Sequence, residues 1–280
     1  MSLRTHASRA RRWTNRKRSP RYGEAVFLLN RIFFAEKTVL FAKKEGVCMV
    51  VAAVLAGGSG TRMGAAAPKQ YLLLGNEPIL VHSVRAFVNH EQVDAVCVVV
   101  PAAYKQETEE LLASYFADAA EIAVIAGGAN RSLSLLNAAK HFAETCPPDC
   151  VFLTHDAVRP FVTKRMIDDS IAACRKYGAV GTVVPAVDTL LLSEDGHFIS
   201  SVPPRSTAFH AQTPQTFNLG DLTSLLTQAS EEQLAAFTDG CSVFLAAGKR
   251  VYMVQGEPYN IKITYPDDLI RGEEILKKHF

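Results

Sequence analysis

The chain has 280 residues, of which 48% are hydrophobic and 21% charged, and its formal net charge is +2 at pH 7. A chain of this size can bury a sizeable core, as one large α/β domain or two small ones. No apolar run reaches the roughly 18 residues that a membrane-spanning helix needs, so the sequence predicts a soluble protein with no membrane segment.

The positive charge is concentrated at the start of the chain. Residues 1–48 hold twelve Lys or Arg against three Glu, a net charge of +9, which leaves −7 for the remainder. A nucleic-acid-binding arm, a targeting peptide and a non-native extension all fit such a segment. Because Met49 stands directly before the first predicted strand, we favour a basic extension at 1–48 that is disordered or non-native, and one domain at 49–280. Nothing after residue 48 indicates a nucleic-acid-binding surface.

The six cysteines do not follow a metal-binding pattern. Cys146 and Cys150 are the only close pair, and the sequence contains no Cys-x-x-Cys. A zinc site is therefore a weak prediction. Reduced thiols in a cytoplasmic protein explain the cysteines adequately, because disulfides are rare in that compartment.

The first predicted strand leads into a glycine-rich loop. Val50–Leu55 is a short apolar run bounded by glycines, which is typical of a fully buried parallel strand. Glycine lets the backbone approach a ligand closely, so the N–H groups of this loop can face phosphate oxygens. Two cations, Arg62 and Lys69, lie in the same stretch, which favours a polyphosphate with a bound metal. The glycines are Gly57, Gly58, Gly60 and Gly64.

The glycine spacing excludes the two best-known phosphate loops. The Walker A pattern Gly-x-x-x-x-Gly-Lys-Ser/Thr is absent, and the span from Gly58 to Gly64 has one residue too many for the Gly-x-Gly-x-x-Gly dinucleotide fingerprint. A plain turn that joins a strand to a helix is the alternative. Such a turn has no need of two cations along one loop.

Predicted strands and helices alternate after this loop. Alternation of this kind implies right-handed β-α-β crossovers and a three-layer, doubly wound, mostly parallel Rossmann-like α/β sheet. The predicted helices begin at Pro78 and cover 103–116, 131–143 and 164–177, and the predicted strands cover 94–100, 121–126, 149–154 and 179–185.

Polar residues gather at the predicted carboxyl ends of the strands, where ligands bind in such sheets. Gly127 and Gly128 follow one strand, and Arg131 and Ser134 open the next helix. A Gly-Gly turn can hydrogen-bond a base edge through its backbone. A plain turn with Asn130 as the helix N-cap is the alternative.

Asp156 follows the next strand and is expected to face the cationic loop. It is a predicted Mg²⁺ ligand, because Mg²⁺ is usually held by one or two carboxylates together with substrate phosphates. An N-cap role or a salt bridge to Arg159 is the alternative. His155 is expected to be a packed histidine at the strand end rather than a base.

Residues 186–213 predict a β-hairpin that turns at Asp195-Gly196, a favoured hairpin dipeptide. A hairpin inserted between crossover units has little core of its own. We therefore expect this arm, residues 186–212, to pack on a second subunit in a homodimer. Two helices, a strand over 250–255 and a last helix from Pro266 complete the predicted elements.

Several short motifs follow one another from Val50 to the C-terminus. They are Leu55-Ala-Gly-Gly-Ser-Gly-Thr-Arg-Met63 with Pro68-Lys-Gln70, Gly127-Gly128 with Arg131, His155-Asp-Ala-Val-Arg-Pro160, Asp188-Thr189, Arg205, Gln212-Thr-Pro-Gln215, Thr238-Asp239 and Asn260-Ile-Lys-Ile-Thr264. In this order they resemble the CTP-dependent polyol-phosphate cytidylyltransferases. The resemblance implies a nucleotidyltransferase fold, an Mg²⁺ cofactor and a reaction in which the phosphate of a polyol phosphate attacks the α-phosphorus of CTP while pyrophosphate leaves.

The resemblance also implies a role for each matching residue. Arg62, Lys69 and Lys262 would be the catalytic cations, and Asp156 would hold Mg²⁺, with Asn260 as a weaker second contact. The nucleotide would contact Leu55, Ala56, Gly57, Gly58, Gly60, Thr61, Gly128, Arg131 and Ser134. The polyol phosphate would contact Asp156, Arg159, Thr213 and Thr238, and also Thr189 and Arg205 on the arm of a neighbouring subunit.

Two polyol phosphates remain open. At Val158, at Leu190-Leu191 and at Gly240-Cys241 the sequence departs from the motifs typical of the methylerythritol-phosphate enzymes. These residues look more like the ribitol-5-phosphate branch, which is linked to teichoic acid, and they favour D-ribitol 5-phosphate as the substrate. Arg205-Ser206 also suits the 2-C-methyl-D-erythritol 4-phosphate branch, which serves isoprenoid biosynthesis.

Two other classes of protein are weighed against this interpretation. An NAD(P)-binding oxidoreductase would need a residue that binds the ribose at the end of the second strand, and Val100–Tyr104 offers none nearby. A nucleotide-sensing module without catalysis is disfavoured only because every expected catalytic position is filled.

Overall fold

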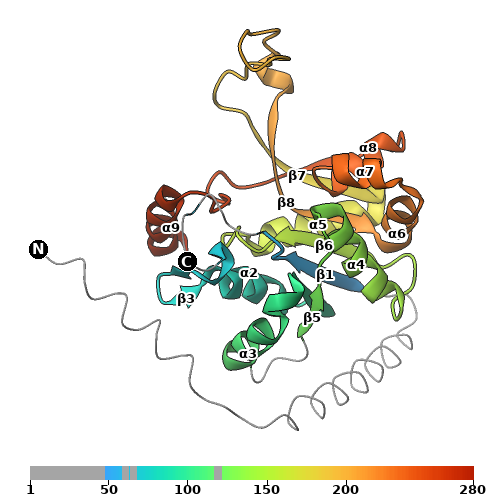
Figure 1. The fold of residues 1–280 in the computed structure, drawn as a ribbon, viewed down its shortest axis with the longest axis vertical. Coiled ribbons are helices and arrows are strands. Elements are labelled where there is room, and N and C mark those ends of the chain that lie inside the picture. Colours follow the sequence, from blue (N-terminus) through green and yellow to red (C-terminus); the bar gives the residue numbers. More distant parts are fainter. Residues whose placement is uncertain (1–47, 59–62, 64–67, 117–121) are drawn as a thin grey trace, which may run out of the picture. The chain divides into compact units, whose positions relative to one another are not determined.

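The computed structural model describes residues 48–58, 63, 68–116 and 122–280. At their centre lies a seven-stranded sheet with the order β5-β4-β1-β6-β8-β7-β9 (Figure 1). Neighbouring strands are parallel except at β8, which runs antiparallel to β6 and β7. The predicted mostly parallel α/β fold is thus confirmed. The strands are β1 (Val50–Leu55), β4 (Ala95–Val100), β5 (Ile122–Ala126), β6 (Val151–Asp156), β7 (Ala179–Pro185), β8 (Phe209–Asn218) and β9 (Tyr252–Gln255), with a separate pair β2 (Leu73–Leu74) and β3 (Glu77–Pro78).

The central strands are apolar because both of their faces are covered. Every residue of β1 and β6 is buried, as is every residue of β4 after the first. Continuous burial of this kind is typical of parallel strands between two helical layers. The parallel register between β1 and β6 sets Leu55 beside Asp156, so both strands end at the same edge of the sheet.

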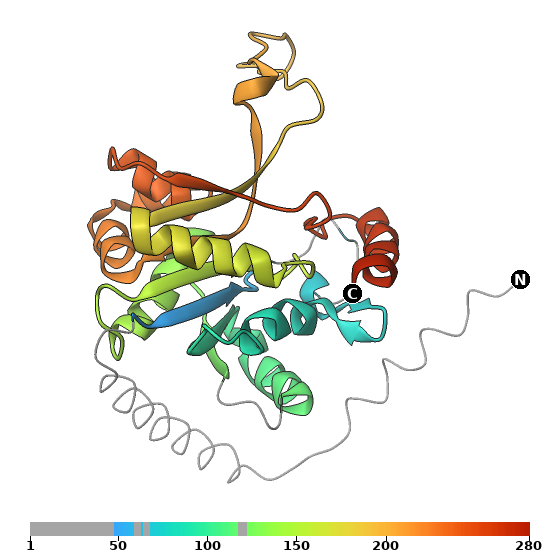
Figure 2. The same cartoon turned by 180° about the vertical axis from the view of Figure 1, so that it is seen from behind.

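Helices cover both faces of the sheet (Figures 1 and 2). Phe87 of α2 and Ile171 of α5 pack on one face in a cluster with Val54 of β1. On the other face, Phe142 of α4 meets Phe152 of β6 with 5.8 Å between the ring centroids. The helices are α2 (Ile79–Val88), α3 (Lys105–Tyr115), α4 (Arg131–Ala143), α5 (Lys164–Tyr177), α6 (Leu219–Gln228), α7 (Glu231–Ala236), α8 (Gly240–Ala246) and α9 (Pro266–His279).

The predicted β-hairpin over residues 186–213 is not confirmed. Between β7 and β8 the chain leaves the sheet as a projecting segment (Figure 1), in which one isolated bridge pairs Leu192 with Ser201. The chain does reverse around Asp195-Gly196, where Asp195 Oδ1 accepts hydrogen bonds from the N–H groups of His197 and Phe198, but residues 194–198 form no backbone hydrogen-bonded turn. A two-stranded ladder depends on side chains that pack across it. Here the apolar side chains are exposed instead, Phe198 to 78%.

A strand was not expected at residues 212–217, which the structure places within β8. The stretch reads as a loop because it is rich in Gln and Thr, yet it is buried between two strands. Its amides are satisfied by distant partners: Gln212 Nε2 donates to the Glu257 carbonyl at 2.8 Å, and Gln215 Nε2 donates to Asp239 at 2.6 Å. Three helices, α6 to α8, follow β8 where two are predicted.

Parts of the sequence analysis concern residues that the structure does not describe. The predicted extension at 1–48 lies outside the described residues apart from Cys48, and so do Gly60, Thr61, Arg62 and Gly64 of the glycine-rich loop. Within the described part of the chain, no helix is both long enough and apolar enough to cross a membrane.

Candidate active site

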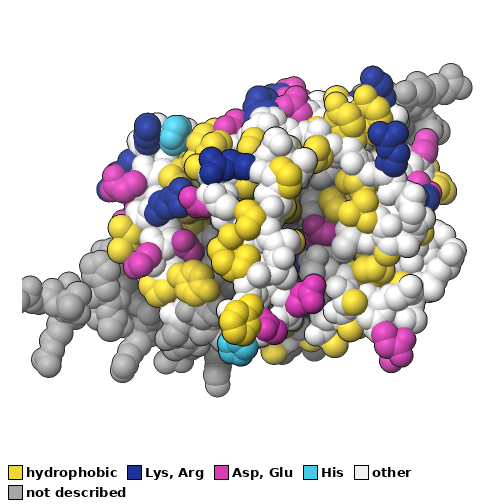
Figure 3. Space-filling model, turned by 90° about the horizontal axis from the view of Figure 1, so that it is seen from above, with side chains coloured by type: hydrophobic (Ala, Val, Ile, Leu, Met, Phe, Trp, Pro, Cys, Tyr) yellow, Lys and Arg dark blue, Asp and Glu magenta, His cyan; other side chains and the backbone are white. Residues whose placement is uncertain are grey.

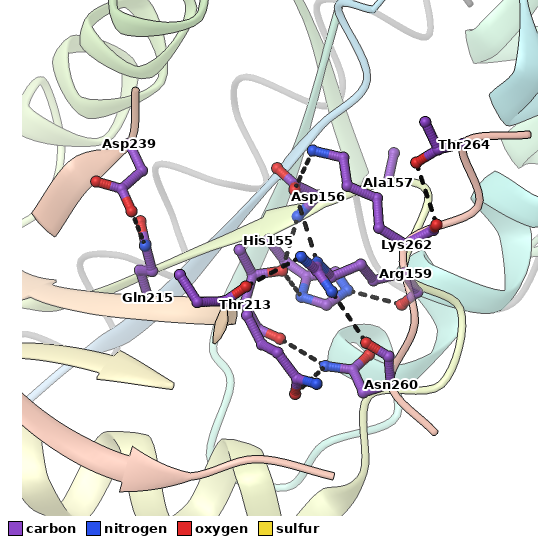
Figure 4. A network of polar contacts seen from close by, with 12 residues as sticks. His155, Asp156, Ala157, Arg159, Thr213, Gln215, Asp239, Asn260, Lys262 and Thr264 are labelled. Carbon is purple, nitrogen blue, oxygen red and sulfur yellow. Dashed lines mark hydrogen bonds and ion pairs between the residues drawn. The ribbon is translucent and has the colours of Figure 1, made fainter. Parts of the chain in front are cut away.

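The carboxyl edge of the sheet carries a cluster of charges around one buried carboxylate. Asp156 ends β6, and its Oδ1 accepts a hydrogen bond from Arg131 at 2.8 Å. Its Oδ2 accepts one from Lys262 Nζ at 2.9 Å and lies 3.7 Å from Arg159 Nε (Figure 4). The three cations come from the start of α4, the turn after β6 and the segment before α9. Segments far apart in the sequence therefore meet at this carboxylate.

The cations decide the ionisation state of Asp156. Burial alone would raise the pKa of this carboxyl, but Arg131, Lys262 and Arg159 together hold its pKa well below its usual range. Asp156 is therefore ionised at neutral pH. One carboxylate cannot neutralise three cations, so the cluster keeps an excess of positive charge. An edge of this kind attracts anions.

The glycine-rich loop supplies a further cation to the same edge. Lys69 is buried, and its Nζ donates a hydrogen bond at 2.8 Å to the carbonyl of Ile263, the residue after Lys262. Gln70 Nε2 donates to the Ala56 carbonyl at 2.7 Å, which ties the end of the loop to its beginning. Leu55 and Ala56 are buried, whereas Gly57 and Gly58 are exposed. The loop thus presents exposed backbone with a cation close to Lys262.

A second glycine turn lies beside the first. Ser134 Oγ accepts a hydrogen bond from the Gly128 N–H at 3.1 Å and donates one to the Asn130 carbonyl at 2.9 Å. A Cβ at Gly57 would lie 3.7 Å from this Oγ, and one at Gly128 would lie only 2.3 Å from the Leu133 Cβ. The two turns therefore adjoin, and a side chain at Gly128 would clash. Asn130 does cap α4, since its side chain accepts from the Leu133 N–H.

A network of buried hydrogen bonds supports the segments that carry Asp156 and Arg159. Both ring nitrogens of His155 are partnered, by Thr213 Oγ1 and by the Arg159 carbonyl, each at 2.9 Å (Figure 4). Burial lowers the pKa of His155 to about 4, so the ring is neutral. Asn260 Nδ2 donates to the Thr213 carbonyl at 3.0 Å, and Arg159 Nη1 donates to the Asn260 carbonyl at 3.0 Å. His155 is thus a packed histidine, as expected.

Three predicted substrate contacts are not brought to Asp156. On the arm, Arg205 Nη2 donates to Thr189 Oγ1 at 3.2 Å, and both residues are exposed. Thr238 is exposed just before α8. Its neighbour Asp239 is held by Gln215, and Figure 4 shows that this pair lies to one side of the cluster. The sequence motifs contain Gln215 and Asp239, but no chemical signal in the sequence pairs them.

Known proteins with similar sequences identify the family. The family model described as IspD, 2-C-methyl-D-erythritol 4-phosphate cytidylyltransferase, matches residues 49–278. A ribitol-5-phosphate cytidylyltransferase from Lactiplantibacillus plantarum is 40% identical over 233 residues, which cover 82% of this chain and 99% of that protein.

Solved structures agree with the fold. The 4-diphosphocytidyl-2C-methyl-D-erythritol synthase of Anaerococcus prevotii matches with a TM-score of 0.69 at 27% identity, over 82% of this chain and 96% of that one. The 2-C-methyl-D-erythritol 4-phosphate cytidylyltransferase of Francisella tularensis matches with a TM-score of 0.69 at 26% identity, over 81% and 99% of the two chains.

The α/β sheet, the cations at the carboxyl ends of its strands and the similarity to these relatives together define a CTP-using nucleotidyltransferase. The chain belongs to the 2-C-methyl-D-erythritol 4-phosphate cytidylyltransferase family. The resemblance drawn from its motifs is therefore confirmed, and neither the oxidoreductase nor the sensing module is needed to explain the glycine-rich loop.

Proposed function

We propose that this enzyme transfers the CMP group of CTP to D-ribitol 5-phosphate, giving CDP-ribitol and pyrophosphate. The observation that supports this polyol is the identity with the Lactiplantibacillus plantarum ribitol-5-phosphate cytidylyltransferase, which extends over nearly all of that protein. 2-C-Methyl-D-erythritol 4-phosphate is the second candidate, because the family description and the solved structures carry that name.

The proposed reaction needs positioning and charge neutralisation more than it needs a base. A phosphate oxygen of the polyol phosphate, already anionic, forms a bond to the α-phosphorus of CTP. The bond from that phosphorus to the oxygen shared with the β-phosphorus breaks, and pyrophosphate leaves. The excess positive charge around Asp156 suits a reaction in which negative charge builds up between two phosphate groups.

We assign the triphosphate to the side of the edge that carries Lys69 and Lys262. The contact of Lys69 with the Ile263 carbonyl supports this assignment, because it sets the two lysines on facing segments. Arg62 would add a third cation from the glycine-rich loop, and the exposed backbone of Gly57 and Gly58 would face phosphate oxygens. The cytosine and ribose would lie toward the adjoining turn at Gly128.

We assign the polyol phosphate to the side of Arg159. This guanidinium is held by the carbonyls of Asn260 and Ala211 at 3.0 and 3.2 Å, so its position is fixed before a ligand binds. Thr213 would complete this side from the same chain.

Asp156 is the residue that we propose for Mg²⁺. The described residues contain no group of three or more His, Cys, Asp or Glu that could hold a metal, so a metal here would take most of its ligands from phosphates and water. A carboxylate at the phosphate-binding edge fits that requirement. Asn260 Oδ1, a buried oxygen with no hydrogen-bond partner among the described residues, is a candidate for a second contact. Bound Mg²⁺ would neutralise the leaving pyrophosphate.

We further propose a cytoplasmic homodimer. The arm exposes apolar side chains, and hydrophobic groups gather on the face that carries it (Figure 3). A second subunit that covered them would also receive Thr189 and Arg205 near its polyol phosphate. The six cysteines are all free thiols, which supports the proposed cytoplasmic location. The exposed apolar residues of the arm are Val187, Leu191, Leu192, Phe198, Ile199, Val202 and Phe209.

The substrate is tested by measuring pyrophosphate release from CTP and Mg²⁺ with a panel of polyol phosphates. We expect kcat/KM to be highest for D-ribitol 5-phosphate, with 2-C-methyl-D-erythritol 4-phosphate as the matched competitor. A preference for the competitor would replace the proposed substrate. Absence of pyrophosphate with every polyol phosphate would contradict the proposed activity.

The lysines are tested by Lys69→Met and Lys262→Met. We expect each substitution to lower kcat at least about a hundredfold, because loss of one group that stabilises developing charge commonly costs about 3 kcal/mol. Lys249→Met is the matched control, since Lys249 forms an exposed ion pair with Asp221 at 3.1 Å. It should turn over like wild type. A lysine variant that is folded and as active as this control would have no part in the mechanism.

The dimer is tested by analytical ultracentrifugation of the wild type and of the double variant Phe198→Ser/Ile199→Ser. We expect the wild type to be a dimer at micromolar concentration and the variant to dissociate and lose activity, because the arm would no longer complete the neighbouring site. Leu245→Ser, which changes an apolar residue of α8 that is 61% exposed, should stay dimeric. A fully active wild-type monomer would refute the assembly.

A further inference from the structure

His155 occupies an unusual position for a residue that no substrate can touch. It is fully buried, it precedes Asp156 at the end of β6, and it has a polar partner on both sides of its ring. One partner is the hydroxyl of Thr213 in β8, and the other is the carbonyl of Arg159 in the turn after β6. The ring therefore connects two segments that carry groups of the active site.

The partners of the ring leave only one arrangement of its hydrogens. The Arg159 carbonyl can only accept, so the ring hydrogen must be on Nε2. Nδ1 is then an acceptor and takes the hydrogen of the Thr213 hydroxyl. The lone pairs of that same hydroxyl accept from the Asp156 N–H at 3.2 Å. Each donor in the series from Asp156 to Arg159 thus has one acceptor. If the ring hydrogen were on Nδ1 instead of Nε2, a buried group would lose its hydrogen-bond partner.

These hydrogen bonds form a closed cycle around the turn that carries Asp156 and Arg159. The Arg159 N–H donates to the Asp156 carbonyl at 3.0 Å, which forms the turn itself. His155 then binds the Arg159 carbonyl from inside, and Thr213 binds the Asp156 N–H (Figure 4). The imidazole holds the Arg159 end of the turn directly and the Asp156 end through the Thr213 hydroxyl, so a shift of the ring would displace the carboxylate and the guanidinium together.

We propose that His155, as its neutral Nε2–H form, is a positioning residue that sets Asp156 and Arg159 for phosphoryl transfer. This inference rests on the proposed function, since it deepens the roles assigned there to both side chains. His155 touches no reacting atom. It acts through Thr213 and the turn, and a misplacement of about 1 Å at a reacting group is enough to cost on the order of a hundredfold in rate.

The alternative to positioning is simple packing, because the His155 ring also lies 5.1 Å from the ring of Phe87. Three variants separate the two roles. His155→Gln can keep an N–H donor for the Arg159 carbonyl, His155→Leu keeps apolar bulk without any hydrogen bond, and Phe87→Leu is the matched control that removes only packing.

We expect opposite rankings of activity and stability. His155→Leu should lower kcat by about 10- to 100-fold, because Asp156 and Arg159 would be displaced together. His155→Gln should recover most of the kcat although its Tm is no higher than that of the leucine variant. Phe87→Leu should lower the Tm and leave kcat near wild type. A kcat that follows Tm across the three variants, or a leucine variant as active as glutamine, would overturn the proposal.

Ring ¹⁵N NMR of the wild-type protein gives a readout that does not depend on turnover. We expect His155 to show a bare Nδ1 and a slowly exchanging hydrogen on Nε2, and a Thr213→Val variant should shift the Nδ1 signal alone. An Nδ1–H tautomer would overturn the proposal whatever the substrate. If the NMR result is as expected and no polyol phosphate yields pyrophosphate, the proposed function fails and the assigned hydrogen arrangement stands.

Discussion

The organisation of this enzyme depends on one buried carboxylate, that of Asp156. A charge that is removed from water must be paired. Removing the partner of a buried charge costs far more folding free energy than removing the partner of an exposed charge. Asp156 takes its partners from three separate segments, through Arg131, Arg159 and Lys262. The requirement to pair this carboxylate therefore draws α4, the turn after β6 and the segment before α9 to one point of the sheet edge.

The surplus of cations at that point is what makes the edge suited to polyphosphate chemistry. Groups that are aimed before the substrate arrives need no reorganisation during the reaction, and this is the main source of electrostatic catalysis. The buried contacts of Lys69 and Arg159 with backbone carbonyls hold both cations in place. The buried side chains of His155, Thr213 and Asn260 complete the support.

The parts of the fold that follow from local pattern were predictable, and the parts that depend on distant partners were not. The helices 131–143 and 164–177 and the strand 179–185 agree with the structure residue for residue, because their caps and apolar periods are local. The amide side chains of strand β8 are buried because they bind residues more than twenty positions away. Nothing in the sequence indicates which residues these partners are.

The same limit applies to the site. The glycine turns and the residues at the strand ends mark the edge, because parallel strands end together. The pairing of Asp156 with Lys262, 106 residues further along the chain, has no signature in the sequence. The arm illustrates the reverse case, since the chain reverses around Asp195-Gly196 and yet does not extend into paired strands.

The central claim is that the charges around Asp156 are the place where the triphosphate of CTP and its metal bind. A crystal structure of the enzyme with CTP and Mn²⁺, recorded with the anomalous signal of manganese, tests it most directly. We expect the manganese peak at the Asp156 carboxylate and the triphosphate between Lys69 and Lys262. A triphosphate bound elsewhere, or manganese without contact to Asp156, would contradict it.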